Sequence, residues 1–230
     1  MSEKISYTHQ RNLHTNEGAK DALTKILGGT LPDSLLDIGC GTGTWLSAAQ
    51  GLGVKDLKGV DGIRVADELL AVSPDLIEQR DFRKPWTIGR TFDLSICLEV
   101  AEHIDEEHAD RLITEICKTS DQVFFSAAAP YQGGDHHVNC QWPEYWQKKF
   151  NDNGFSCDDE VRWKIWDESL IEPWYRQNIF FAKSSDQAGS EARIKGVYHS
   201  DMIQYLKLKE LAPRKFLKGR ILRALGMNKS

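Results

Sequence analysis

The sequence contains no hydrophobic run long enough to cross a membrane. A membrane-spanning helix needs about 20 consecutive apolar residues, and no stretch of the 230 residues approaches that length. The first residues, MSEKISYTHQRN, are polar and lack the apolar centre of a secretion signal. Hydrophobic residues (40%) and charged residues (27%) occur at ordinary frequencies, which excludes a mainly disordered chain. We therefore expect a soluble, cytoplasmic protein.

Cysteines are few, and their spacing does not suggest pairing. The chain has five, an odd number, and no two of them form a C-x-x-C pair. This pattern excludes both a disulfide framework and a zinc site built on cysteines, and it favours a reducing compartment. The five are Cys40, Cys97, Cys117, Cys140 and Cys157.

Basic charge is scarce except at the C-terminal end. The formal net charge is −5, although residues 201–230 contain eight Lys and Arg residues against two acidic residues. The remainder is therefore strongly acidic and a poor match for a phosphate backbone, so no nucleic-acid partner is expected. Within 213–225, Leu217, Ile221 and Leu225 follow one another at helical spacing. Such a basic helix either packs its apolar face on the body or contacts an anionic membrane surface.

Apolar runs and helical periodicities alternate along the chain. Strands are predicted at 34–38, 57–61, 75–79, 92–98 and 123–128, around Phe155 and at 179–182. Helices are predicted at 44–52, at 106–118, from Pro143 onward and around 202–211. This alternation is typical of an α/β fold with a mostly parallel sheet covered on both faces. We divide the chain into an N-terminal helical segment (1–33), a body (34–183), a linker (184–192) and a basic helical tail (193–230).

The strongest local motif is LLDIGCGTGTW at 35–45. A buried strand brings Asp37 to its carboxyl end, where ligands bind in open α/β sheets. Gly39, Gly41 and Gly43 then let the backbone approach a ligand closely. The spacing differs from the G-x-G-x-x-G of dinucleotide-binding proteins. Since Asp37 is the only charged residue between positions 35 and 53, the loop favours a cationic, phosphate-free ligand, although a tight turn without a ligand is the alternative.

Two more acidic positions follow the next predicted strands. Asp61 ends its strand twenty residues after the middle glycine, a distance typical of a carboxylate that binds ribose hydroxyls. Capping of a following helix is the alternative role. Asp81 and Phe82 follow the third strand, where the edge and face of an adenine would lie. Asp81 is equally suited to pairing with Arg80 or Arg83.

These motifs together resemble class I S-adenosylmethionine (SAM)-dependent methyltransferases. The resemblance rests on LLDIGCGTGTW, KGVDG, RDF and FDLSICLEVAEHI, and it extends over 34–183. It implies a Rossmann-like seven-stranded sheet with one antiparallel strand near its edge, and SAM as the cofactor. It also implies the following roles: Asp37, Gly39, Gly41 and Gly43 hold the methionine part, Asp61 the ribose, Asp81 and Phe82 the adenine, and Glu99 borders the methionine and the substrate.

The segment 130–146, PYQGGDHHVNCQWPEYW, is a dense polar cluster on a loop where function is expected. It resembles a bacterial subgroup with the pattern Q-G-G-x-G-H-V-N-E-Q-W-P-x-Y-W, followed later by W-Y-R-Q-N, here at 174–178. The subgroup is similar to enzymes of polysaccharide, glycolipid and small-metabolite synthesis, which implies a sugar-hydroxyl acceptor. This chain departs from the pattern at His136, where glycine is usual, and at Cys140, where glutamate is usual.

Methyl transfer to a hydroxyl requires in-line approach and a base for the hydroxyl proton. Histidine suits that role near neutral pH, and His137, which matches the pattern, is the preferred base with His136 as the second candidate. The alternative is that His137 orders the loop. The residues predicted to contact the substrate are Asn139, Gln141, Trp142, Tyr145 and Arg176.

Other polar groupings admit a second interpretation. Asp135, His136 and His137 could ligate a metal, but no second acidic partner has a suitable spacing, so we expect no metal site. Glu102 and His103 resemble an acid/base pair, yet E-H-I at this place is common in the superfamily, so we interpret His103 as a positioning residue. Arg176 either clamps an anionic substrate group or pairs with Glu172.

The sequence thus predicts a SAM-dependent methyltransferase that methylates an oxygen of a sugar, a glycan or another small polar acceptor. One alternative is a non-catalytic SAM-binding partner of another enzyme. A less favoured alternative is an NAD-dependent oxidoreductase.

Overall fold

Seven strands form a single sheet in the order β3-β2-β1-β4-β5-β7-β6. The computed structural model describes residues 16–211. The strands are β1 (Ser34–Ile38), β2 (Asp56–Asp61), β3 (Ile77–Gln79), β4 (Leu94–Leu98), β5 (Gln122–Ser126), β6 (Phe155–Asp158) and β7 (Phe180–Ser184). Only β7 runs antiparallel to its neighbours β5 and β6. This arrangement confirms the predicted Rossmann-like sheet with one antiparallel strand near its edge.

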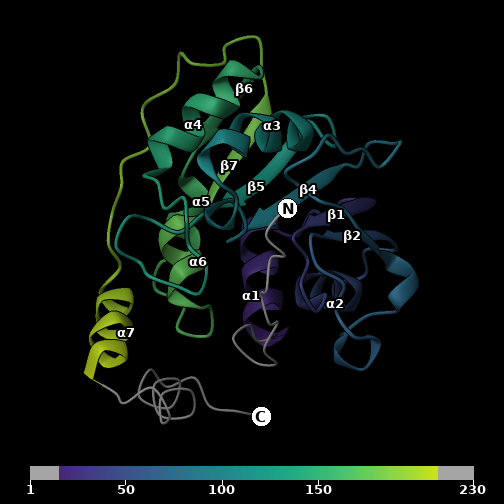
Figure 1. Cartoon of the computed structure of the whole chain (residues 1–230), viewed down its shortest axis with the longest axis horizontal. Coiled ribbons are helices and arrows are strands. Elements are labelled where there is room, and N and C mark those ends of the chain that lie inside the picture. The colour runs from purple at the N-terminus through teal and green to yellow at the C-terminus, as the bar shows by residue number, and fades with distance from the viewer. Residues whose placement is uncertain (1–15, 212–230) are drawn as a thin grey trace, which may run out of the picture.

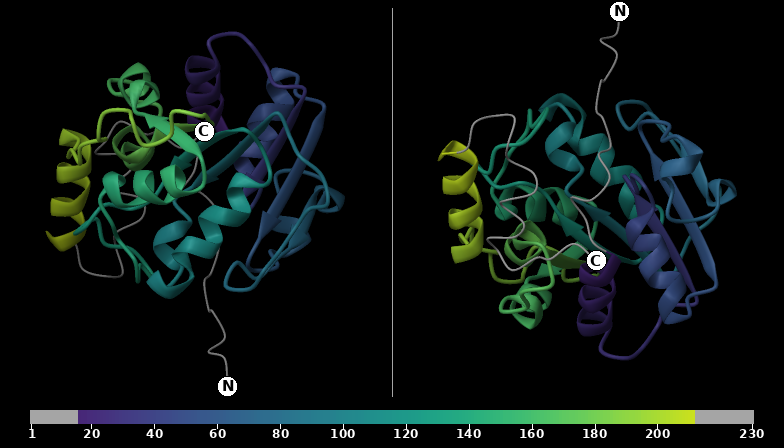
Figure 2. Two further views of the ribbon diagram at one scale, coloured as in Figure 1. Left: turned by 90° about the horizontal axis from the view of Figure 1, so that it is seen from above. Right: turned by 90° about the horizontal axis from the view of Figure 1, so that it is seen from below.

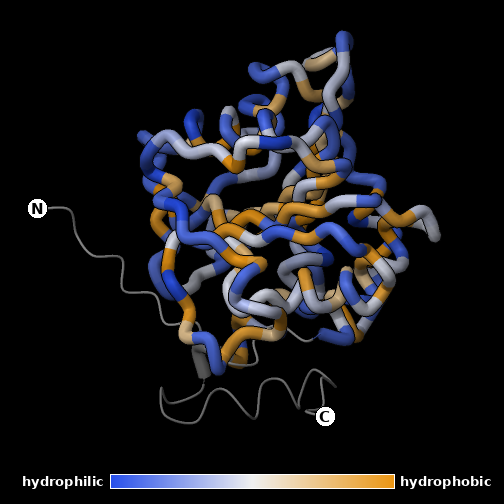
Figure 3. The backbone as a smooth tube through the Cα atoms, turned by 90° about the vertical axis from the view of Figure 1, so that its right-hand side faces the viewer, coloured by the Kyte–Doolittle hydropathy of each residue, from blue (hydrophilic) through white to orange (hydrophobic). Residues whose placement is uncertain are grey.

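Helices cover both faces of the sheet (Figures 1 and 2). One face packs against α1 (Asn16–Leu27), α2 (Thr44–Leu52), α5 (Glu160–Ile165) and α6 (Pro173–Asn178), and the other against α3 (Glu106–Cys117) and α4 (Pro143–Asp152). Neighbouring strand residues alternate between two cores, so Leu35 joins the first and Leu36 the second. The strands are apolar through the centre of the molecule (Figure 3).

The third strand is shorter than its sequence pattern predicted. Residues Pro74–Leu76 form a 3-10 helix, and β3 begins only at Ile77. Pro74 has no backbone N–H and a fixed φ, which favours the first turn of a helix over a strand. The strand predicted at 92–98 likewise begins at Leu94, and the one predicted at 123–128 ends at Ser126.

The connection that follows β7 lies against the body. Glu191, within the predicted linker, accepts hydrogen bonds from Gln147 Nε2 (3.1 Å) and Asn151 Nδ2 (2.5 Å) on α4 and from the N–H of Cys157 (3.0 Å) on β6. Ile194 is buried, and its N–H donates to Gln147 Oε1. The chain then enters α7 (Ser200–Leu211), which lies at the periphery beside α6 (Figures 1 and 2).

Both ends of the chain lie outside the part that the structure describes. The basic helix predicted within 213–225 lies outside the described residues, as do positions 1–15. Within residues 16–211, no helix is both long enough and apolar enough to span a bilayer.

Candidate active site

The glycine loop turns sharply between β1 and α2. Gly39, Gly41 and Gly43 have φ values of +79°, +53° and +77°, which L side chains rarely adopt. A Cβ on Gly39 would also lie 2.2 Å from Val100 Cγ2. The loop therefore requires glycine at these positions for its own conformation, as well as for access to a ligand.

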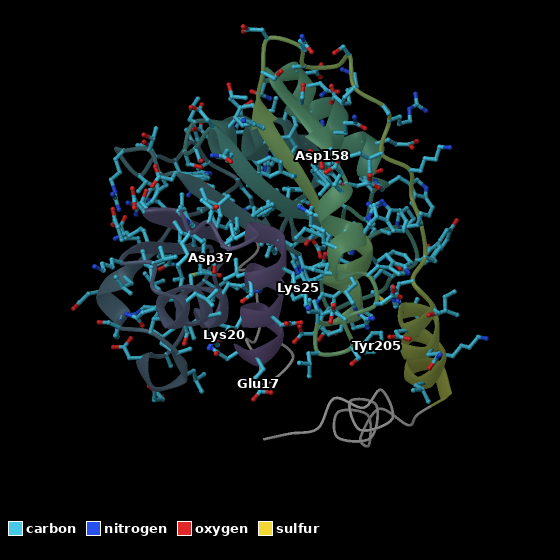
Figure 4. All side chains as sticks on the ribbon, turned by 180° about the vertical axis from the view of Figure 1, so that it is seen from behind. Glu17, Lys20, Lys25, Asp37, Asp158 and Tyr205 are labelled. Atoms are coloured by element: carbon cyan, nitrogen blue, oxygen red, sulfur yellow. The ribbon has the colours of Figure 1, made fainter. Side chains whose placement is uncertain are left out.

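Asp37, the last residue but one of β1, carries a buried carboxyl group. Its side chain is 3% exposed, and Oδ2 has no hydrogen-bond partner among the described residues. Burial, together with the nearby charge of Asp61, raises the pKa of Asp37 to about 8. Asp37 is buried, whereas Glu17 and Lys20 on α1 are exposed, and all three are labelled in Figure 4. An uncompensated buried carboxylate is costly, so a cationic ligand such as SAM fits this position.

Asp61 holds the glycine loop in place. Oδ2 accepts the N–H of Gly41 (2.8 Å), and Oδ1 accepts the N–H of Ile63 (2.8 Å). The next helical turn begins only at Asp67, so Asp61 does not cap a helix. Each carboxylate oxygen has a second lone pair, and ribose binding by Asp61 stays a prediction.

The predicted adenine-contact residues have partners within the protein. Asp81 forms an ion pair with Arg83 (2.9 Å), while Lys84 Nζ lies 3.4 Å from its other oxygen. Hydrogen bonding to Arg83 is the main cause that lowers the pKa of Asp81 to about 2. Phe82 is buried edge-on against Trp86, with ring centres 5.6 Å apart. The pairing alternative is thus realised with Arg83, and contact with adenine stays a prediction.

Glu99 joins two motifs that are distant in the sequence. It follows β4 with a φ of +56°. Its Oε2 accepts a hydrogen bond from Gln132 Nε2 (2.8 Å), and its Oε1 accepts one from Asn178 Nδ2 (3.0 Å). Asn178 also donates to Gln132 Oε1 (2.8 Å). The QGG loop and the WYRQN helix are therefore tied together around one carboxylate, a role for Gln132 and Asn178 that sequence reasoning missed.

Glu102 belongs to the short 3-10 helix Ala101–His103, and its carboxyl group lies beside that of Glu99. Its side chain is 1% exposed, and Oε2 is buried without a hydrogen-bond partner among the described residues. Burial first, and then the charge of Glu99, raise the pKa of Glu102. The Glu102 carbonyl accepts the N–H groups of Val138 (2.9 Å) and Asn139 (3.0 Å), which fixes the loop after β5 against this helix.

His137 meets His103 across this junction. Their ring centres are 4.8 Å apart and the rings are nearly perpendicular. One ring nitrogen of each and one carboxylate oxygen of Glu102 all lie within 4.8 Å of one another. The sulfur of Cys140 lies 3.7 Å from His137 Nδ1. The sequence pointed to His137, but only the fold brings His103 and Glu102 to it.

His136 and Asp135 have exposed side chains and do not belong to this cluster. His136 adopts a φ of +61°, and its backbone carbonyl accepts His103 Nδ1 (3.1 Å). The grouping of Asp135, His136 and His137 weighed from the sequence is therefore corrected. The acidic member of the cluster is Glu102 and the second imidazole is His103, because the loop backbone turns at His136.

Residues 7–174 match the family described as a methyltransferase domain. The chain belongs to this methyltransferase family. No curated protein matches the chain.

Solved structures of methyltransferases share the fold. Magnesium protoporphyrin IX methyltransferase from Synechocystis PCC 6803, with bound SAH, is 22% identical and has a TM-score of 0.52. The match covers 74% of this chain and 83% of that one. A sugar N-methyltransferase from Streptoalloteichus sp ATCC 53650 is 14% identical, with a TM-score of 0.56, and the match covers 81% of this chain and 99% of that one. A SAM-bound amino pentose methyltransferase from Micromonospora echinaspora is 14% identical, with a TM-score of 0.54, and the match covers 80% of this chain and 100% of that one.

In this methyltransferase, the predicted substrate residues of the loop lie at the start of α4. Asn139 is buried, and its Oδ1 accepts Gln141 Nε2 (3.0 Å). The Trp142 ring lies edge-on to Tyr198, 5.7 Å between centres. The Lys149 ammonium lies over the Tyr145 ring, 4.5 Å from the ring centre. Contact of these residues with a substrate stays a prediction.

Arg176 has a structural partner that the sequence did not reveal. Its guanidinium is buried and donates to Asp201 Oδ2 (2.8 Å) and to the carbonyl of Trp166 (3.2 Å). The interaction with Asp201 joins α6 to α7. These contacts give Arg176 an anchoring role between the two helices, and its contact with an anionic substrate group stays a prediction.

Proposed function

We propose that this methyltransferase transfers the methyl group of SAM to a hydroxyl oxygen of a sugar, a glycan or another small polar acceptor. The observation that carries the proposal is the uncompensated Asp37 carboxyl at the glycine loop, together with the Glu102, His103 and His137 cluster where the segments after β4 and β5 meet. SAM as the cofactor is supported by structural neighbours of the same fold that were solved with SAM or SAH bound.

The cofactor site is formed by residues of β1 and β2. Asp37 compensates a positive charge on the ligand, the three glycines leave room for it, and Asp61 accepts ribose hydroxyls. Bound SAM supplies an electrophilic methyl group on a sulfonium, whose leaving group is a neutral thioether. The protein therefore needs no acid for the leaving group, and its remaining task is to orient and activate the acceptor.

The acceptor site is formed by the polar groups beyond β4 and β5. Gln132 and Asn178 hold the Glu99 carboxylate in one orientation, which suits it to accept hydrogen bonds from acceptor hydroxyls. His137, beside His103, assists removal of the proton from the attacked hydroxyl. A sugar acceptor, though not the methylated atom, is further supported by two structural neighbours, a sugar N-methyltransferase and an amino pentose methyltransferase.

The test measures methyl transfer from isotope-labelled SAM to neutral sugars, aminosugars and nucleotide-linked sugars. The methylated atom is then located by mass spectrometry and NMR. We expect transfer to oxygen. We also expect His137→Ala to lose about 10²–10⁴ in rate while binding SAH within about twofold of the wild type. His108→Ala, which removes an imidazole from α3 outside the cluster, is the matched control and keeps its activity.

Three results would contradict this proposal in different ways. Unchanged turnover in His137→Ala removes that residue from the mechanism. Methylation of amino nitrogens alone overturns the oxygen assignment. SAH binding without transfer to any acceptor favours the non-catalytic SAM-binding protein.

A further inference from the structure

The Glu102, His103 and His137 cluster has the donor set of a metal site. A single loop–helix junction supplies one carboxylate oxygen and two imidazole nitrogens within 4.8 Å of one another. Two histidines and one carboxylate suit divalent transition metals such as Mn²⁺, Fe²⁺ and Zn²⁺. Glu102 and His103 are adjacent in the sequence, and the fold brings His137 to them from the loop after β5.

An independent observation concerns the Glu102 carboxylate. This side chain is 1% exposed, and its Oε2 is buried without a hydrogen-bond partner among the described residues. Glu99 lies next to it, and no Lys or Arg of residues 16–211 forms an ion pair with either carboxylate. Two adjacent carboxylates in a buried site require a shared proton or a cation. A divalent cation meets both the charge and the missing contact.

The surrounding residues hold the donors in the orientation that a metal needs. His103 Nδ1 donates to the carbonyl of His136, which fixes the orientation of the imidazole ring at the cluster. Gly134 makes room for the His137 ring, because a Cβ there would lie 2.1 Å from His137 Nε2. Gln132 donates to Glu99 and keeps that second carboxylate beside the cluster. Such outer contacts orient ligands in metal sites.

We propose that Glu102, His103 and His137 bind one divalent transition-metal cation, with Glu99 beside it. What the cation does rests on the proposed function: it binds the acceptor hydroxyl and stabilises its deprotonated form. His137 then acts as a metal ligand and not as a base, and the proton of the hydroxyl, made more acidic by the cation, passes to solvent water. Binding of the cation itself does not depend on the identity of the acceptor.

The test uses the full chain without an affinity tag, treated with a chelator and then titrated with Mn²⁺, Zn²⁺ or Mg²⁺ by calorimetry. Neither SAM nor an acceptor is present. We expect one site per chain with preference for Mn²⁺ or Zn²⁺ over Mg²⁺, and metal content near one after dialysis. Glu102→Gln, His103→Gln and His137→Gln should each weaken binding more than about tenfold. SAH binding serves as the check that each variant is folded.

His136→Asn is the matched control. It removes the adjacent exposed imidazole, and asparagine tolerates the positive φ found there. Its metal affinity should equal that of the wild type. Absence of metal binding by the wild-type chain overturns the proposal. So does binding that survives all three ligand substitutions or is lost in His136→Asn.

The same preparations separate this proposal from the proposed function. Metal binding that depends on the three ligands supports the site even if no acceptor is methylated, and in that case only the proposed function fails. Methyl transfer that continues unchanged after removal of the metal overturns the role of the cation in the reaction and leaves the methyltransferase function standing.

Discussion

Gly134 makes the position of His137 possible. Nothing in the local pattern distinguishes the two adjacent glycines at 133 and 134, yet they serve different needs. Gly133 has a φ of +64° and open space around its Cβ position, so its constraint is conformational. Gly134 is constrained by the imidazole ring that occupies the place of its missing side chain. One glycine shapes the loop and the other admits a functional side chain.

Gly134→Ala should therefore damage the cluster without damaging the cofactor site. A methyl group at this position pushes the His137 ring away from Glu102 and His103. We expect methyl transfer to fall at least about tenfold, since loss of geometry weakens a preorganised site, while SAH affinity measured by calorimetry is unchanged. Gly51→Ala is the control, because that helical position has open space around it. Equal activity of the two variants would show that the ring position is unimportant.

At the scale of elements, Glu191 fastens the chain that follows β7. One carboxylate bridges α4 and β6 and accepts the N–H of Gly189 as well. Burial opposes the ionised form, but hydrogen bonds from Asn151 and other donors outweigh it and lower the pKa of Glu191 to about 2. A small, polar, turn-prone segment that reads as a linker is thus held against the body by one side chain.

We expect Glu191→Ala to lower stability by about 1.5–3 kcal/mol, the range for hydrogen bonds to a charged group. In a chain of this size that corresponds to a fall in Tm of several degrees. Differential scanning calorimetry measures the change, and Asp186→Ala, an exposed position in the same connection, is the control. If both variants had the Tm of the wild type, the connection would be a linker without a structural role.

At the scale of the whole molecule, Asp37 couples cofactor binding to global stability. Its pKa of about 8 exceeds its ordinary value of 3.8, chiefly because the side chain is buried. The folded state therefore binds a proton that the unfolded state releases. The stabilisation is complete below the unfolded pKa and is lost as pH rises through about 8. The ionised carboxylate binds a cationic ligand, so the site is kept ready at a cost in stability.

The wild-type chain without cofactor should therefore lose stability between pH 4 and 8 relative to Asp37→Asn, as measured by denaturant unfolding at each pH. SAH affinity should rise with pH over 6–8 in the wild type, by at most about tenfold per pH unit, and binding should release a proton. Asp37→Asn should bind SAH weakly with no such pH dependence. Asp33→Asn, an exposed position just before β1, serves as the control. A variant with wild-type pH dependence would remove Asp37 from the cofactor site.

Several properties followed from the sequence alone because their causes are local. Alternating apolar runs indicated the α/β sheet, and the glycine spacing indicated a turn that ends in a ligand site. Asp37 and Asp61 were predictable because the carboxyl ends of neighbouring parallel strands meet at one edge. Pro74 shows the limit of such reasoning, because turn chemistry shortened β3 in a stretch with strand-like periodicity.

The tertiary structure alone decided which side chains meet. Glu99 and Asn178 are 79 residues apart and become partners because the sheet order places β7 beside β5 and β5 beside β4. His103 and His137 meet because the loop after β5 folds back onto the turn after β4. Periodicity and turn signals act over a few residues, whereas partner choice depends on strand order and on the burial of groups that must then find partners. The sequence therefore determined the fold and the glycine loop with Asp37 and Asp61. The packing of distant segments determined the cluster of Glu99, Glu102, His103 and His137.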